Sequence, residues 1–156
     1  MAERYVTPEY ADLYFQTKLN TNPWDTANYE NRSKALYEAT RIIDALPLIE
    51  TKAVKDQVLR FPRTNQLAGD PPIPTVPTDV EEACCDIALA LLADVSPEHE
   101  YNLLSRVTVG YATTRQQKDT EMVEPHIAAG IPSLSAWQKL LKYVRDYQSI
   151  KLVRDS

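Results

Sequence analysis

Residues 78–92 read TDVEEACCDIALALL, and this stretch predicts the central helix of the fold. Thr78 and Glu81 have the spacing of a capping box, in which each side chain satisfies a backbone amide of the other residue. A stripe of apolar residues wide enough for a helix packed on several sides follows at helical spacing. Its members are Val80, Ala83, Cys84, Ile87, Ala88, Leu91, Leu92 and Val95.

The two cysteines of the chain, Cys84 and Cys85, are adjacent in this predicted helix. Neighbouring helical positions point about 100° apart, so the pair predicts neither an ordinary disulfide nor a zinc site. We expect both to be small core residues.

Two helices are predicted ahead of the central one. The first begins at Thr7-Pro8-Glu9, which supplies a cap, a first-turn proline and an acid for the helix dipole, and it ends at Asn20-Thr21-Asn22-Pro23. The second covers about residues 26–46, with Asp25 or Thr26 as its cap, and Pro47 stops it. The apolar stripes are Tyr10, Leu13, Tyr14 and Phe15 in the first helix, and Tyr29, Leu36, Ala39, Ile43 and Leu46 in the second.

A proline-rich segment links the second helix to the central one. Residues 61–77 contain five prolines, which exclude a continuous helix and favour a stiff, polyproline-like strap on the surface. We expect Phe61 to pack against the helices and Arg63 to pair with an acid or a backbone carbonyl. A short helix is predicted just ahead of the strap, over residues 54–59.

The pattern after the central helix is shorter and mixed. Ser96-Pro97-Glu98 predicts a short helix to about residue 105, and the alternation of Val107, Val109 and Tyr111 predicts a strand that needs a partner. A last helix is predicted from Ser133 or Ser135. Its apolar side carries Leu134, Trp137, Leu140, Leu141, Val144 and Tyr147.

The predicted fold class is mainly α. We expect a compact helical bundle of about four to five helices with a Pro-rich strap, a short β element and an extended C-terminal tail. Residues 1–148 are expected to form a single helical domain, and residues 149–156 a tail that could act as a docking arm.

Composition excludes several function classes. The 156 residues include three isolated glycines, so neither a dinucleotide-binding GxGxxG loop nor a P-loop can be built. His99 lies in a Glu-His-Glu triplet and His126 follows a proline, and neither has the neighbours of a metal site or a nucleophilic triad. We expect no catalytic residues, no cofactor and no metal. No signal-peptide pattern or long apolar stretch is present, which predicts an intracellular protein with no membrane partner.

Charge is distributed unevenly along the chain, whose net charge is −5. Residues 79–105 carry seven acids and no Lys or Arg, whereas the C-terminal stretch carries Lys139, Lys142, Arg145, Lys151 and Arg154. The nine tyrosines and two tryptophans would allow stacking of single-stranded bases, but the predicted core faces include Tyr10, Tyr14, Tyr29, Trp137 and Tyr147. A single-stranded-DNA-binding or replication accessory protein therefore stays open as the alternative.

Several motifs resemble those of the head-to-tail connector proteins of tailed bacteriophages, also called adaptor or head completion proteins. They begin with Tyr10, Tyr14 and Trp24, followed by Lys34-Ala35-Leu36 and Ala39. The next are QxLxFPR at residues 57–63 and IPxxP at residues 73–77, ahead of Glu82-Ala83-Cys84. Gln57, Leu59, Phe61, Pro62 and Arg63 would form a structural motif of that family.

The resemblance implies a structural virion protein of the neck, assembled in the host cytoplasm. It implies a homo-oligomeric ring, commonly a dodecamer, that binds the portal protein and tail or nozzle proteins. Genomic double-stranded DNA would pass through its channel during ejection without specific binding, along the acidic face. Docking on the portal or on neighbouring subunits would use the tail residues Ile150, Lys151, Leu152, Val153 and Arg154 and the strand residues Val107, Val109 and Tyr111.

Overall fold

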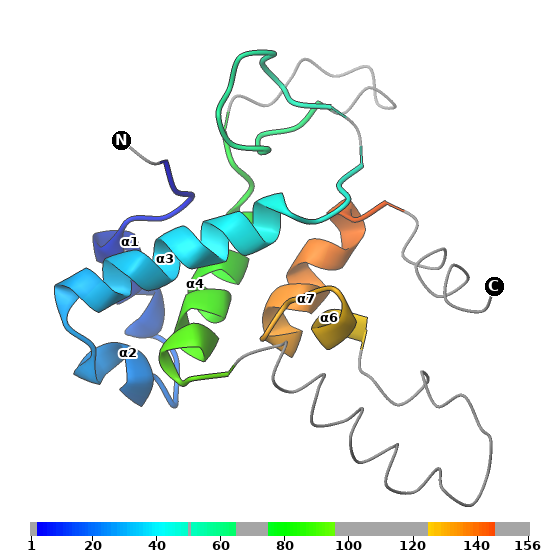
Figure 1. The fold of residues 1–156 in the computed structure, drawn as a ribbon. Coiled ribbons are helices and arrows are strands. Elements are labelled where there is room, and N and C mark those ends of the chain that lie inside the picture. Colours follow the sequence, from blue (N-terminus) through cyan, green and yellow to red (C-terminus); the bar gives the residue numbers. More distant parts are fainter. Residues whose placement is uncertain (1–2, 50, 65–74, 96–124, 146–156) are drawn as a thin grey trace, which may run out of the picture.

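The computed structural model describes residues 3–49, 51–64, 75–95 and 125–145, and within these ranges the chain is mainly helical (Figure 1). The coarse fold class predicted from the sequence is therefore confirmed. The described helices are α1 (Pro8–Phe15), α2 (Asn22–Thr26), α3 (Tyr29–Asp44), α4 (Thr78–Leu92), α6 (Pro125–Ala128), α7 (Leu134–Leu140) and the 3-10 helix η2 (Leu141–Tyr143). Pairing between extended segments in this part of the chain is limited to two isolated antiparallel bridges, Leu48 with Val144 and Lys52 with Arg63.

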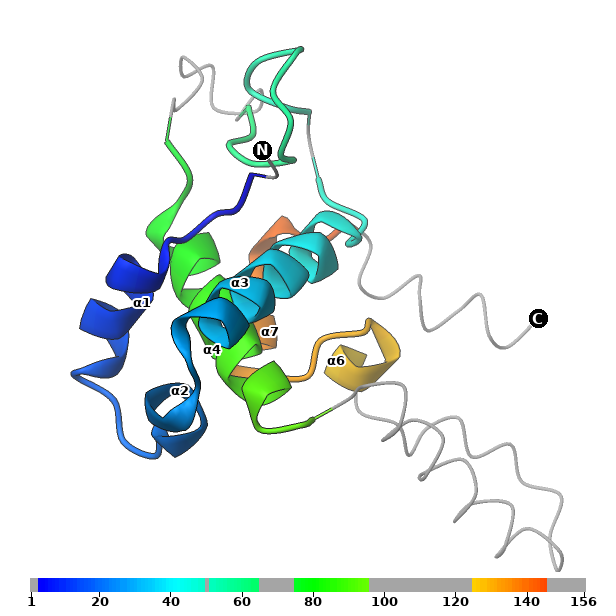
Figure 2. The ribbon, with the colours of Figure 1, turned by 60° about the vertical axis from the view of Figure 1, so that its left-hand side comes forward.

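Helix α4 lies at the centre of the core, as its sequence predicts. It packs against α3 and α7 and also contacts α1 and α2 (Figures 1 and 2). Small side chains such as Ala39, Ala83 and Ala136 are fully buried where these helices meet, which lets the backbones approach closely. Trp24, Phe61 and Leu36 are the largest of the fully buried side chains, and each contributes about 1.5–3 kcal/mol through burial.

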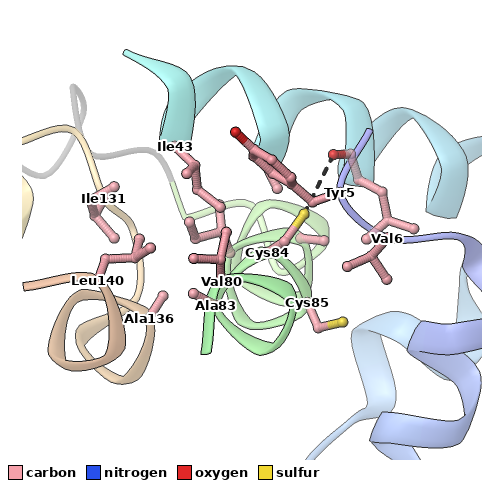
Figure 3. Close-up of a cluster of buried hydrophobic side chains, with 14 of the residues drawn as sticks. Tyr5, Val6, Ile43, Val80, Ala83, Cys84, Cys85, Ile131, Ala136 and Leu140 are labelled. Carbon is pink, nitrogen blue, oxygen red and sulfur yellow. Dashed lines mark hydrogen bonds between the residues drawn. The ribbon is translucent and has the colours of Figure 1, made fainter. Parts of the chain in front are cut away.

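The two cysteines point to different sides of α4 (Figure 3). The Sγ atom of Cys84 lies 3.7 Å from Thr40 Oγ1 and 3.8 Å from the Leu36 carbonyl, both on α3. Cys85 lies on the side that faces α1. Both thiols are free and fully buried, and burial raises the pKa of Cys84 to about 12. Their predicted core role is confirmed.

The start of α1 is confirmed, whereas the predicted long second helix is two helices. Thr7 caps α1 by accepting from the Tyr10 amide at 3.3 Å. Residues 22–26 form α2, and the extended Ala27 separates it from α3. The cap of α3 is Asn28, whose side chain accepts from the Asn31 amide at 2.8 Å, so the predicted cap at Asp25 or Thr26 is wrong.

Side-chain exposure also corrects parts of the predicted stripes. Leu13, Tyr29 and Leu134 are 66%, 61% and 53% exposed, respectively, so they lie outside the core. Tyr29 and Leu134 are the first residues of α3 and α7.

The predicted capping box at the start of α4 is wrong by one residue. The cap position is Pro77, whose carbonyl accepts from the amides of Val80 and Glu81, and Thr78 already lies inside the helix. A proline has no side-chain acceptor, so the backbone alone closes this end. At the other end, α4 stops at Leu92, before the left-handed Asp94 (φ 62°) and short of the predicted Val95.

Helix α7 is shorter than its apolar pattern predicts. Ser133 caps it as expected, accepting from the Ala136 amide at 3.3 Å. After Leu140 the chain tightens into η2 and then pairs with the segment that follows α3: the Ile49 amide donates to Tyr143 and the Arg145 amide donates to Pro47. This pairing ends the helix, because Val144 is extended and buried against Leu48.

None of the helices in the described ranges combines the length and the apolar character needed to cross a membrane. The predicted helix at residues 96–105 and the strand at 107–111 lie outside the described residues.

Candidate nucleic-acid interface

The segment 51–64, here called the basic loop, carries Lys52, Lys55, Arg60 and Arg63 against the single acid Asp56. Its net charge is +3 in a chain of net charge −5. The loop follows α3 and projects away from the helices (Figures 1 and 2). The predicted helix over residues 54–59 is wrong, because this segment forms bends and turns.

Gln57 organises the basic loop from inside. Its side-chain amide donates to the carbonyls of Leu59 and Pro62, both at 2.9 Å, and its Oε1 accepts from the Val54 amide at 2.9 Å. The two arms of the loop are joined by Ala53 N to Pro62 O, also at 2.9 Å. These bonds satisfy backbone groups that a helix would otherwise pair. Residues 54–59 can therefore form the loop instead of the predicted helix.

Phe61 anchors the basic loop in the core. Its side chain is 2% exposed, with the Tyr5 and Tyr143 ring centres 6.0 and 5.2 Å away in edge-on geometry. The Tyr5 hydroxyl accepts from the Phe61 amide at 3.2 Å and donates to the Asp44 carboxylate. Burial raises the pKa of Asp44, and the hydrogen bond from Tyr5 opposes this only in part. The contacts expected for Phe61 are therefore present.

The cations of the basic loop are held by neutral carbonyl oxygens. Lys52 donates to the Gln57 carbonyl at 3.0 Å and Arg60 to the Asp44 carbonyl at 3.1 Å. Arg63 donates to the carbonyls of Ile49 and Arg60, at 2.5 and 3.0 Å, which is one of the two pairings expected for it. A carbonyl orients a cation without cancelling its charge. The Asp44 carboxylate lies near Arg60 and Lys52 and offsets part of their charge, and residues 51–64 still carry an excess of cations over acids.

Along α3, a second group of cations surrounds an aromatic ring. The guanidinium of Arg4 lies 4.9 Å from the centre of the Tyr37 ring and donates to Ser33 Oγ at 2.6 Å. Lys34 and Arg41 occupy the adjacent turns on the same side of the helix. Both form exposed ion pairs within the helix, Lys34 with Glu30 at 2.6 Å and Arg41 with Glu38 at 3.7 Å.

The acidic residues of α4 have a different environment. Lys139 lies 2.7 Å from Asp86 and 3.4 Å from Glu82 and also donates to the Tyr14 hydroxyl at 2.9 Å. Burial lowers the pKa of Lys139, but the hydrogen bonds to Asp86 and Tyr14 outweigh it and raise the pKa overall. Lys142 pairs with Asp79 one turn further along. The prediction that these acids form an open acidic face is therefore wrong, because Lys139 of α7 and Lys142 of η2 pair with them.

Other polar side chains have structural roles or lack a hydrogen-bond partner in the described structure. Arg32 spans α1 and α2: it bonds to the carbonyls of Trp24 and Asp25 and to the Asp12 carboxylate at 3.3 Å. His126 belongs to α6 and its Nδ1 is buried without a hydrogen bond in the described structure, so its predicted place in a solvated loop is wrong. No cluster of three metal-ligating side chains is found within the described residues.

The predicted docking residues Val107, Val109 and Tyr111, and the tail residues 150–154, lie outside the described residues. Gln57, Leu59, Phe61, Pro62 and Arg63 all belong to the basic loop, where Gln57 and Phe61 fix its shape.

Comparison with known proteins gives one match. A family model described as "Putative DnaT-like ssDNA binding protein" matches residues 1–154. The chain belongs to this family. No curated protein and no solved structure matches the chain significantly.

The family match corrects the resemblance to phage connector proteins. It contradicts the structural role in a virion neck, the portal and tail partners, the ring around passing double-stranded DNA and the virion location. The motifs that carried the resemblance are short runs of Pro, Phe, Arg and Ala, and the structure uses several of them to pack the core and close the basic loop. Such residues recur wherever a proline-rich segment crosses a helical core.

Sequence reasoning set the nucleic-acid interpretation aside because it followed charge along the central helix. The missed signal was the local excess of cations at residues 51–64, next to a buried phenylalanine. Cations three to five residues apart look scattered in the sequence, and the closed loop gathers them on one segment.

Proposed function

We propose that the protein binds single-stranded DNA as a replication accessory factor. The single observation that carries the proposal is the family match over residues 1–154. The basic loop supports it independently, since four cations on one projecting segment attract a phosphate backbone.

The proposed role is binding without catalysis. The family description names a binding activity and no reaction. The described cations are held by carbonyls, rings or surface acids, which suits reversible contacts with phosphates and bases.

We also propose one helical domain over residues 1–148, built as a bundle, with a C-terminal tail at 149–156. The shared core of α1, α3, α4 and α7 supports the single domain. Limited proteolysis would test it: one stable fragment that lacks only the tail is expected, and stable fragments cut within residues 1–148 would contradict it.

The function is tested by fluorescence anisotropy with a labelled oligothymidine, in parallel with a duplex of the same length. We expect the full chain to prefer the single strand and its affinity to fall with salt. The slope of log affinity against log salt should be about −0.7 for each phosphate neutralised. Equal affinity for the duplex, or no binding at low salt, would overturn the proposal.

A further inference from the structure

We propose that Tyr37 and Arg4 form a nucleobase stacking site on the outer side of α3. The inference rests on the proposed function and extends it, because it assigns a base contact in addition to the phosphate contacts of the basic loop. The strand would run from the basic loop along α3, with one base against the Tyr37–Arg4 pair.

The side chains of this path are continuous along one helix. Positions 34, 37, 41 and 44 follow at helical spacing on one side of α3 and span about 15 Å. At the far end, the Arg60 guanidinium bonds to the Asp44 carbonyl and so joins the basic loop to the helix. A run of this length can contact a few nucleotides of an extended single strand.

The Arg4–Tyr37 pair has the chemistry of a stacking platform. The guanidinium lies over the ring at 4.9 Å and is oriented by Ser33, and both planar groups are only half-buried. Bases stack on tyrosine rings and on arginine planes alike, and every base offers such a face. Neither group is held by a carboxylate within the described residues.

Two neighbouring cations can follow the backbone on either side of the stacked base. Lys34 and Arg41 are 66% and 70% exposed, and their partners Glu30 and Glu38 are equally accessible. An ion pair this exposed is weak in water, so a phosphate can replace the carboxylate at little cost.

Other aromatic residues of the described chain are less suited to stacking. Trp24, Phe15 and Trp137 are buried in the core. The Tyr14 hydroxyl is committed to Asp86 and Lys139. Tyr29 is exposed on the same helix, but its hydroxyl donates to the Glu9 carboxylate at 3.3 Å, and no cation lies over its ring within the described residues. Tyr29 is therefore a matched control.

The experiment compares two ligands of equal length, an oligothymidine and the same backbone with abasic sites. Affinities are measured for the full chain and for Tyr37→Ala, Tyr37→Leu, Tyr37→Phe and Tyr29→Ala. Tyr37→Leu keeps apolar packing without an aromatic face, and circular dichroism checks that each variant is folded.

We expect Tyr37→Ala and Tyr37→Leu to bind oligothymidine about tenfold more weakly and the abasic strand unchanged. Tyr37→Phe and Tyr29→Ala should match the unaltered chain on both ligands. Unchanged affinity of folded Tyr37→Leu, or an equal loss on both ligands, would overturn the stacking site while the proposed function stands. Absence of single-strand binding by the unaltered chain would overturn both.

Discussion

The acidic side of α4 and the basic loop carry similar numbers of charges but use them differently. On α4, Asp86 and Glu82 meet Lys139 in a half-buried cluster, and the lysine offsets part of their negative charge within the molecule. On the basic loop, the side chains of Lys52 and Arg60 donate to carbonyl oxygens, and the segment keeps an excess of positive charge although the Asp44 carboxylate lies near both cations. Whether a charged side chain is available to a ligand therefore depends on its partner in the fold. The number of like charges in the sequence does not decide it.

The two regions also differ in how they are attached to the core. The α4 cluster sits on a helix that is buried on most of its sides. The basic loop depends on one ring, Phe61, packed between Tyr5 and Tyr143. Loss of that ring should separate the loop from the fold.

The largest expected effect is that of Phe61→Ala. Removing a fully buried ring costs about 3–5 kcal/mol of unfolding free energy. Urea denaturation followed by circular dichroism measures it. Val58→Ala, at a position 67% exposed in the same loop, is the control and should change stability by less than about 0.5 kcal/mol. A loss below 1 kcal/mol for Phe61→Ala would mean that the loop is not anchored by its ring.

The next effect is expected for Asp86→Ala, which leaves Lys139 half-buried with Glu82 and Tyr14 as its remaining partners. We expect the free energy of unfolding to fall by about 1–3 kcal/mol. Removing one partner of an ion pair that lies partly out of water leaves the other charge poorly compensated, which destabilises the fold. Asp79→Ala breaks the exposed pair with Lys142 and should cost at most about 1 kcal/mol. Equal losses in urea denaturation would contradict the distinction between the two pairs.

A smaller effect is expected for DNA-binding affinity, in which variants of Lys55 and Lys142 should differ. Fluorescence anisotropy measures it. Lys55 is exposed and has no ion pair in the described structure, whereas Lys142 is paired with Asp79. Losing one phosphate contact lowers affinity about fourfold at roughly 0.15 M salt. We therefore expect Lys55→Ala to bind oligothymidine about fourfold more weakly and Lys142→Ala to bind it unchanged. The reverse order would mean that the strand passes over η2 instead of the basic loop.

The helices and the core could be predicted from the sequence because their signals are local. The stripe from Val80 to Ala88 and the cap at Thr7 each need only a few consecutive residues, and both are found. The break at Ala27 was missed because Tyr29 and Leu36 fit one continuous stripe, and it is the Asn28 cap that restarts the helix.

The candidate interface could not be predicted because it depends on contacts between distant positions. Lys139 and Asp86 are 53 residues apart, and Phe61 meets a tyrosine 56 residues away. Charge counted along the chain therefore assigned the acids of α4 to an open surface. The basic loop was also missed, because Gln57 closes it through hydrogen bonds that no periodic sequence pattern predicts.

The smallest expected effect concerns Asp44, an acid at the junction of the basic loop and α3. Burial raises its pKa in the folded chain, so the folded state keeps the proton in a pH range where the unfolded chain has lost it. Stability from this group is greatest below its ordinary pKa and is lost as the pH rises through the higher folded value. Asp44→Asn keeps an acceptor for Tyr5 and Arg60 but carries no charge.

We therefore expect the stability of Asp44→Asn, relative to the unaltered chain, to rise between pH 4 and pH 7. The gain should be small, because water still reaches the half-buried carboxylate and reduces the cost of its charge. Urea midpoints at the two pH values measure it, with the exposed Asp56→Asn as the control. A constant difference across pH would show that the carboxylate is not disfavoured in the fold.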